Sequence, residues 1–264
     1  MSRLLLPALA GAALAAAAAA QAAPVELLSH RAAYRLSLAE AAAASGLAEV
    51  EGALVMEWRA GCEGWISNQR LGFVAGTSEG PGFSYDVRFS SWESLDNTRL
   101  RFNVRSFDDG SMTEEFRGQA VLEAPGGPGQ VRYTTPERDE IELPAGTLFP
   151  TEHVRRLIGA ARRGELVVTH EVFDGSGPEG LTRVSAVIGD SKPARPAPGD
   201  VGERRWPVSL AYHDLGSADA TPNFEIAFEL SEGGVLYDVV LDYGDFSLKA
   251  ELEQLETFPA PSCP

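Results

Sequence analysis

The sequence predicts a mainly β protein, built on one antiparallel sheet of about thirteen or fourteen strands with a single amphipathic helix. Short segments of alternating apolar and polar residues recur along the chain at a spacing of roughly 8–12 residues, as in antiparallel sheets. Turns rich in glycine and aspartate separate these segments, and only one segment has helical periodicity. Of the 264 residues, 44% are hydrophobic, which is enough to build a core.

The N-terminus is typical of a Sec-type signal peptide over residues 1–22. Arg3 precedes an apolar run from Leu4 to Ala20, and Ala20-Gln21-Ala22 has the small-x-small pattern of a signal-peptidase site. We expect cleavage after Ala22, export to the periplasm, and one continuous β domain over residues 23–264. A transmembrane anchor is the weaker alternative because the run is mostly alanine. No later segment has enough consecutive apolar residues to span a membrane, so we expect a mature protein that does not.

Eight strands are expected before the helix. Leu100 to Arg105 alternates strictly, which indicates one buried and one solvated face. Asp108-Asp109-Gly110 is typical of a hairpin turn that tolerates positive φ, and Gly61 and Gly64 place Cys62 in another hairpin turn. The expected strands cover residues 34–38, 54–59, 65–73, 83–91, 99–107, 112–122, 130–134 and 140–143.

Six strands are expected after the helix. Ser231-Glu232-Gly233-Gly234 predicts a hairpin turn, and residues 191–199, with three prolines, predict a surface loop. The expected strands cover residues 167–173, 181–188, 206–212, 224–230, 235–241 and 246–255.

The helix is expected over residues 151–163, with Thr151 as its N-cap and Gly164 as its C-cap. Its apolar residues follow the i, i+3, i+4, i+7 pattern of an amphipathic helix that packs on or inside the sheet: Val154, Leu157, Ile158 and Ala161.

Four arginines on this helix form the sharpest basic cluster of the chain: Arg155, Arg156, Arg162 and Arg163. They could bind an anion or a partner protein. The favoured alternative is a solvated helix face whose last-turn cations complement the helix dipole.

Residues with catalytic, cofactor or metal chemistry are not expected. Gly76-Thr77-Ser78-Glu79-Gly80 matches the Gly-x-Ser-x-Gly nucleophile pattern, but a strand rather than a helix is expected to follow, so we interpret it as a turn. The four histidines (His30, His153, His170 and His213) lack metal-site spacing. Asp238, Asp242 and Asp245 could bind calcium, but a turn with solvated carboxylates is favoured. We therefore expect no enzyme, with a hydrolase not fully excluded.

The formal net charge of −16 argues against nucleic acid and against anionic lipid surfaces as partners. The chain has two cysteines, Cys62 and Cys263, and an even count in an exported protein indicates a disulfide. This disulfide would tie the C-terminal tail to an early strand.

Aromatic residues are spread over the expected strands, and alternation directs most of them to one side. Ordinary core packing is the favoured interpretation, with a lipid-sized pocket as the alternative. The residues are Trp58, Trp65, Phe73, Trp92, Phe102, Trp206, Phe224, Phe228 and Tyr237.

Taken together, several segments resemble the EipB family of alphaproteobacterial cell-envelope integrity proteins over essentially the whole mature chain. Their order and the pair of cysteines carry the resemblance: residues 28–32 (LSHRA), 61–65 (GCEGW), 144–153 (PAGTLFPTEH), 172–176 (VFDGS), 241–246 (LDYGDF) and Cys263. The resemblance implies a periplasmic β-spiral or open barrel of about fourteen strands, a helix against the sheet, and a disulfide. It also implies a role in envelope integrity and stress resistance in a Gram-negative cell. The implied fold is similar to that of Lol-type lipoprotein carriers, which does not establish a cargo.

Three functions follow as hypotheses. The first is a non-enzymatic periplasmic factor that maintains envelope integrity as a scaffold or partner-binding protein. The second is a carrier or chaperone for a lipid or lipoprotein on the concave face of the sheet. The third and weakest is a hydrolase that uses Ser78 or a carboxylate pair.

Overall fold

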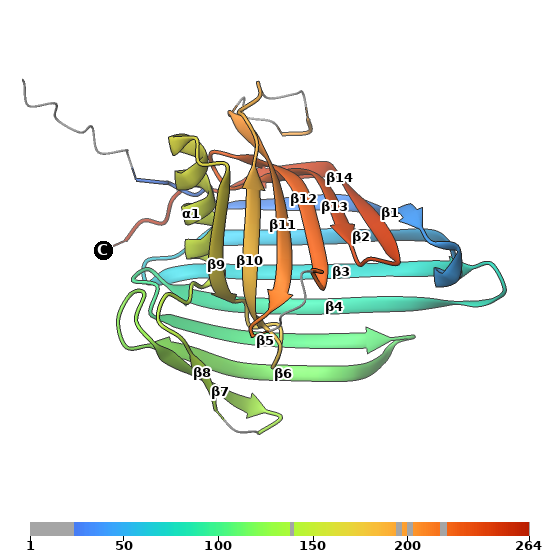
Figure 1. The fold of residues 1–264 in the computed structure, drawn as a ribbon, viewed down its shortest axis with the longest axis horizontal. Coiled ribbons are helices and arrows are strands. Elements are labelled where there is room, and N and C mark those ends of the chain that lie inside the picture. Colours follow the sequence, from blue (N-terminus) through green and yellow to red (C-terminus); the bar gives the residue numbers. More distant parts are fainter. Residues whose placement is uncertain (1–23, 138–139, 194–196, 200–202, 217–220, 264) are drawn as a thin grey trace, which may run out of the picture.

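The computed structural model describes residues 24–137, 140–193, 197–199, 203–216 and 221–263. The expected signal peptide and its cleavage site lie outside the described residues, as does part of the expected loop 191–199. Within the described ranges, the chain forms fourteen strands and one α-helix (Figure 1), which confirms the predicted class. A single 3₁₀ turn, Ala43–Ser45, follows the first strand.

The strands form one antiparallel sheet in the order β8-β7-β6-β5-β4-β3-β2-β1-β14-β13-β12-β11-β10-β9. The first half of the chain contributes β1 (His30–Ala41), β2 (Leu47–Ala60), β3 (Gly64–Thr77), β4 (Gly80–Ser94), β5 (Arg99–Asp108), β6 (Ser111–Leu122), β7 (Gly129–Thr135) and β8 (Ile141–Leu143). The second half contributes β9 (Val167–Phe173), β10 (Leu181–Ile188), β11 (Arg205–Asp214), β12 (Phe224–Ser231), β13 (Leu236–Asp242) and β14 (Phe246–Thr257).

Period-2 patterning explains how the sheet buries one face. In β5, Leu100, Phe102 and Val104 are buried, whereas Arg99 and Arg101 are exposed. The turn between β5 and β6 is the predicted one, with Asp109 at φ 49° and Gly110 at φ 77°. Most strands extend beyond the predicted ranges, because pairing with neighbouring strands continues where alternation in the sequence fades.

The sheet curls until its two edge strands, β8 and β9, come close to each other. Figure 1 shows β9–β13 running steeply across the front, over the long strands β1–β6 behind them. Leu148, in the segment after β8, donates its N–H to the Glu171 carbonyl at 2.8 Å and accepts the N–H of Phe173 at 3.0 Å. The sheet is therefore almost closed into a barrel.

Helix α1 (Pro150–Arg163) connects the two edges of the sheet and packs into its interior. Leu157, Ile158 and Ala161 are buried, as the sequence predicts. Gly164 ends the helix at φ 73° with its N–H directed to the last carbonyls, so the predicted C-cap is confirmed.

The predicted N-cap is wrong. The helix begins at Pro150, and its N-cap residue is Phe149, which makes no side-chain capping bond. Thr151 is already inside the first turn. Proline suits this first position because its fixed φ matches the helix and its missing N–H would have no partner there.

A disulfide joins Cys62, in the turn between β2 and β3, to Cys263, in the tail after β14, with a Cα–Cα distance of 5.5 Å. Strand β1 lies between β2 and β14 in the sheet. The bond therefore holds the C-terminal tail across β1 against the start of β3, as the sequence predicts. The tail is also fixed by Phe258, whose N–H binds the Ser29 carbonyl at 2.8 Å and whose ring lies under the Arg59 guanidinium.

Candidate functional site

The interior of the curled sheet holds a cavity of about 380 Å³, lined by both halves of the sheet and by α1. This volume lies in the range of ligand pockets, roughly 300–1,000 Å³. A smaller cavity of about 240 Å³ continues the same interior toward Tyr243. The two cavities share six lining residues: Met56, Gln69, Val87, Phe89, Ile226 and Leu236.

Side chains inside the sheet are only partly buried around these cavities. Met56, Phe89, Ile226 and Leu236 line the interior, yet each keeps an accessible fraction that a filled core would remove. Helix α1 contributes residues to the larger cavity and none to the smaller one. The helix thus fills one end of the concave face and leaves the rest open.

Some of the predicted aromatic residues line a pocket and others pack in the core, so both predicted alternatives occur. Trp58, Trp65 and Phe228 line the larger cavity, and Phe224 lines the smaller one. Phe102 is ordinary core, where it packs edge-to-face on Phe173 at 5.6 Å between ring centroids.

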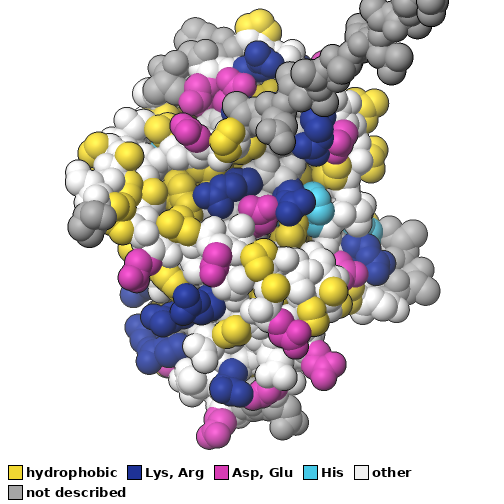
Figure 2. All heavy atoms as spheres, turned by 90° about the vertical axis from the view of Figure 1, so that its left-hand side faces the viewer, with side chains coloured by type: hydrophobic (Ala, Val, Ile, Leu, Met, Phe, Trp, Pro, Cys, Tyr) yellow, Lys and Arg dark blue, Asp and Glu magenta, His cyan; other side chains and the backbone are white. Residues whose placement is uncertain are grey.

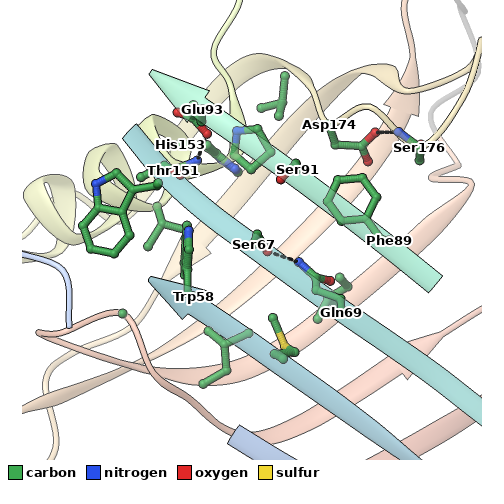
Figure 3. A pocket seen from close by; sticks show the side chains of 18 of the residues that line it. Trp58, Ser67, Gln69, Phe89, Ser91, Glu93, Thr151, His153, Asp174 and Ser176 are labelled. Carbon is green, nitrogen blue, oxygen red and sulfur yellow. Dashed lines mark hydrogen bonds between the residues drawn. The ribbon is translucent and has the colours of Figure 1, made fainter. Parts of the chain in front are cut away.

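Glu93, at the end of β4, holds the N-terminus of α1 at the wall of the cavity (Figure 3). Its two carboxylate oxygens accept the backbone N–H of Thr151 at 2.8 Å and that of Glu152 at 3.2 Å. The carboxylate thereby performs the capping role that the sequence assigned to Thr151. Burial raises the pKa of Glu93 to about 7, against the opposing effect of these hydrogen bonds and of Arg155.

His153, one turn into α1, is buried and faces the cavity (Figure 3). Burial, with a smaller effect of His170, lowers the pKa of His153 to about 3, so its ring is neutral. Its Nε2 has no hydrogen-bond partner among the described residues. The ring lies edge-to-face on His170 of β9, with 5.4 Å between the centroids.

Asp174 follows β9 directly and lies at the other end of the polar wall (Figure 3). Its Oδ1 accepts the N–H of Ser176 at 2.8 Å. Gly175, between them, is pressed against Phe102, where a Cβ would come within 2.8 Å of the Phe102 Cβ. Only glycine fits this contact at φ 79°, so the turn that follows Asp174 requires glycine here. Burial raises the pKa of Asp174.

Polar side chains continue between these groups. Ser67 and Gln69 of β3 and Ser91 of β4 line the cavity, and Gln69 donates to Ser67 at 3.2 Å. The facing wall is apolar, with Leu210, Ile226 and Leu236.

The predicted arginine cluster is interleaved with acidic groups. Arg156 pairs with Glu152 at 2.7 Å, Arg163 with Glu165 at 2.6 Å, and Arg162 with Glu232 at 3.8 Å. Arg155 lies over the ring of Trp65, 5.7 Å from its centroid. On the face that carries α1, Figure 2 shows Lys and Arg side chains next to Asp and Glu. An anion or partner site on Arg155, Arg156, Arg162 and Arg163 stays a prediction.

The other predicted candidates lie in turns. The segment from Gly76 to Gly80 forms the hairpin between β3 and β4, so no helix follows Ser78, whose Oγ lies 3.4 Å from the Gly46 carbonyl. Asp242 accepts the N–H of Gly244 at 2.8 Å and closes the turn between β13 and β14. No group of three or more His, Cys, Asp or Glu side chains in the described part of the chain is placed to hold a metal.

The sequence analysis missed the polar wall. One signal was present: Ser67 and Gln69 fall on the same face as Trp65 and Leu71, so the expected apolar face of that strand is interrupted. Asp174 had no comparable local signal, because a turn carries no periodicity. Its position depends on the curling of the sheet.

The fold and its site define a class: a curled, nearly closed antiparallel sheet with an internal, mostly apolar cavity and a helix at one end. A family model described as EipB-like matches residues 21–259. The chain belongs to this EipB-like family.

Two relatives agree with this assignment. The cell envelope integrity protein EipB of Brucella abortus (strain 2308) is 33% identical over 253 residues, covering 92% of this chain and 89% of that protein. The crystal structure of a beta-barrel-like protein of domain of unknown function DUF1849 from Brucella abortus superposes with a TM-score of 0.83 at 31% identity. This match covers 89% of the present chain and 100% of the Brucella chain. Within the described residues, no helix has the length and apolar character needed to cross a membrane.

Proposed function

We propose that this protein acts in the periplasm, after removal of residues 1–22, as a non-enzymatic factor of cell-envelope integrity that carries an apolar ligand inside its single β domain. The expected ligand is a lipid or the lipidated part of a lipoprotein. The name of the Brucella relative supports the envelope role. The observation that carries the ligand role is the apolar cavity of about 380 Å³.

An unfilled apolar cavity is costly to a folded protein, since its lining loses packing contacts. Side chains such as Met56 and Ile226 are left partly exposed inside the sheet, although ordinary substitutions to larger residues could fill the space. A ligand that occupies the cavity would recover those contacts. The cavity therefore favours the carrier over the scaffold hypothesis. The hydrolase hypothesis gains no support from Ser78, because Ser78 is at the tip of a hairpin.

Native mass spectrometry of protein purified from the periplasm tests the carrier directly. We expect an additional mass of a lipid or lipopeptide on the wild-type protein and its loss in Ile226→Phe, which places a larger side chain in the cavity. Val187→Phe is the matched control, because Val187 is 58% exposed on the outside of the sheet. An unliganded mass for the wild type, with no binding of an added alkyl probe, would refute the carrier.

A second candidate, a partner-binding scaffold, is favoured by an exposed apolar cluster at the β9 edge. Leu166, Val167 and Val187 are 62%, 64% and 58% exposed, and Val167 lies opposite Val187 in the sheet. Val167→Lys would leave the cavity intact. If this variant binds ligand normally but fails to restore detergent resistance in a deletion strain, the scaffold is supported.

A further inference from the structure

The carboxyl groups around the larger cavity differ in what neutralises them. Glu57 pairs with Arg31 and Arg59 on the outside of the sheet, and Glu93 binds the N-terminus of α1. In the described part of the chain, Asp174 is paired with neither a cation nor a helix N-terminus. Burial raises its pKa, and among the described residues hydrogen bonds from Ser176 and from the Asp174 backbone oppose this effect.

Cationic side chains are missing from this cavity. None of the described residues that line it is lysine or arginine. Its two histidines, His30 and His153, have pKa values lowered chiefly by burial and are neutral. The described lining therefore offers carboxylate oxygens and other acceptors, but no lysine or arginine to pair with an anion.

These groups are arranged to receive one end of an elongated ligand. Figure 3 shows Asp174, Ser91 and His153 along the same wall, above Ser67 and Gln69. The facing wall and the smaller cavity beyond are mostly apolar. A ligand with a polar head and an apolar chain would place its head at this wall and its chain toward Tyr243.

We propose that the cavity selects ligands whose head group donates hydrogen bonds, such as an amine or amide, and rejects free carboxylate and phosphate head groups, with Asp174 as the principal acceptor. This inference rests on the proposed carrier function. An anionic head would be buried without a counter-charge beside a carboxylate, which is strongly unfavourable. A donor head would instead form a charge-assisted hydrogen bond with Asp174.

Three probes with the same alkyl chain test this selection: dodecylamine, dodecan-1-ol and dodecanoate. Their affinities are measured by displacement of a polarity-sensitive dye, below micelle formation and at about pH 8, where dodecylamine is protonated and dodecanoate is ionised. We expect the wild type to bind the amine at least roughly tenfold more tightly than dodecanoate, with the alcohol between them.

Asp174→Asn keeps the side-chain volume and an oxygen for the Ser176 N–H. This variant should lose the preference for the amine over the alcohol, while its affinity for the alcohol stays unchanged. Asp190→Asn, which removes an exposed carboxylate, is the matched control and should keep the wild-type order. The wild-type series decides the question even if Asp174→Asn does not fold.

The outcomes separate this inference from the proposed function. If dodecanoate binds as tightly as the amine, or more tightly, the head-group selection is refuted and the carrier stands. If Asp174→Asn keeps the full preference for the amine, Asp174 is not the acceptor. If none of the three probes binds to the wild type, the carrier function is refuted together with the selection.

Discussion

The interior of the curled sheet has two regions built from the same kind of strand but filled differently. Where β5–β8 meet β9, Leu100, Phe149 and Phe173 are completely buried in a continuous cluster. Between β2–β4 and β11–β13, side chains such as Phe89 and Ile226 border an open cavity. The closed region, which we call the seam, joins the two edges of the sheet. The seam is thus tightly packed, whereas the open region leaves space for a ligand.

The largest expected effect is at the seam. Phe173→Ala should lower the free energy of unfolding by about 3–5 kcal/mol, because it removes a fully buried aromatic side chain and leaves a void. Phe224→Ala is the matched control at the wall of the smaller cavity and should cost clearly less, since Phe224 is only partly buried. Urea denaturation of both variants measures the difference. Equal losses would contradict the distinction between seam and cavity.

The disulfide stabilises a different place, the C-terminal tail opposite the seam. Cys62→Ser should lower the free energy of unfolding by roughly 2–5 kcal/mol, because the bond closes a loop between residues 201 positions apart. The melting temperature of the wild type with and without reductant measures this effect, with Cys62→Ser as the control that reductant should not change. Wild-type protein that melts identically in both conditions would show that the tether is dispensable.

Sequence patterns predicted the fold well, because strands and helix are local features. Alternation located all fourteen strands, and periodicity located the buried face of α1 through Leu157 and Ile158. The two cysteines predicted their own pairing, since no other partner exists in the chain.

The site was far less predictable, because it depends on contacts between distant segments. Glu93 lies 58 residues before Thr151, so no local pattern could show that it replaces Thr151 as the cap of the helix. Asp174 becomes part of the polar wall only because the sheet curls. The same long-range geometry left the choice between filled core and open pocket undecided at the level of the sequence.

The Glu93 cap predicts a pH dependence. The folded-state pKa of Glu93 is raised from 4.5 to about 7, so the native protein favours its protonated form. The contribution of protonated Glu93 to the free energy of unfolding is fully present below pH 4.5. It is lost as the pH rises toward about 7, and the loss is about 3 kcal/mol at most. Glu93→Gln keeps an acceptor for the Thr151 N–H and does not ionise, so its stability should lack this loss.

Unfolding free energies of Glu93→Gln and the wild type across this pH range provide the measurement. The lowered pKa of His153 acts in the opposite direction, since neutral His153 favours the folded state as the pH rises. That contribution is common to both proteins and cancels in their difference. A difference that does not grow with pH would show that Glu93 is ionised in the native protein as easily as in the unfolded chain.

The smallest expected effect is an added ring in the cavity. Ile226→Phe should change the free energy of unfolding by less than about 1 kcal/mol, because the larger side chain has open space to enter. Val131 is a completely buried residue of the seam. Val131→Phe adds more side-chain volume than Ile226→Phe where no space exists, and it should lower the free energy of unfolding by about 1–3 kcal/mol. Denaturant unfolding of the two variants compares them directly. If Ile226→Phe is as destabilising as Val131→Phe, the interior around Ile226 is filled as tightly as the seam, and the space required for a ligand does not exist.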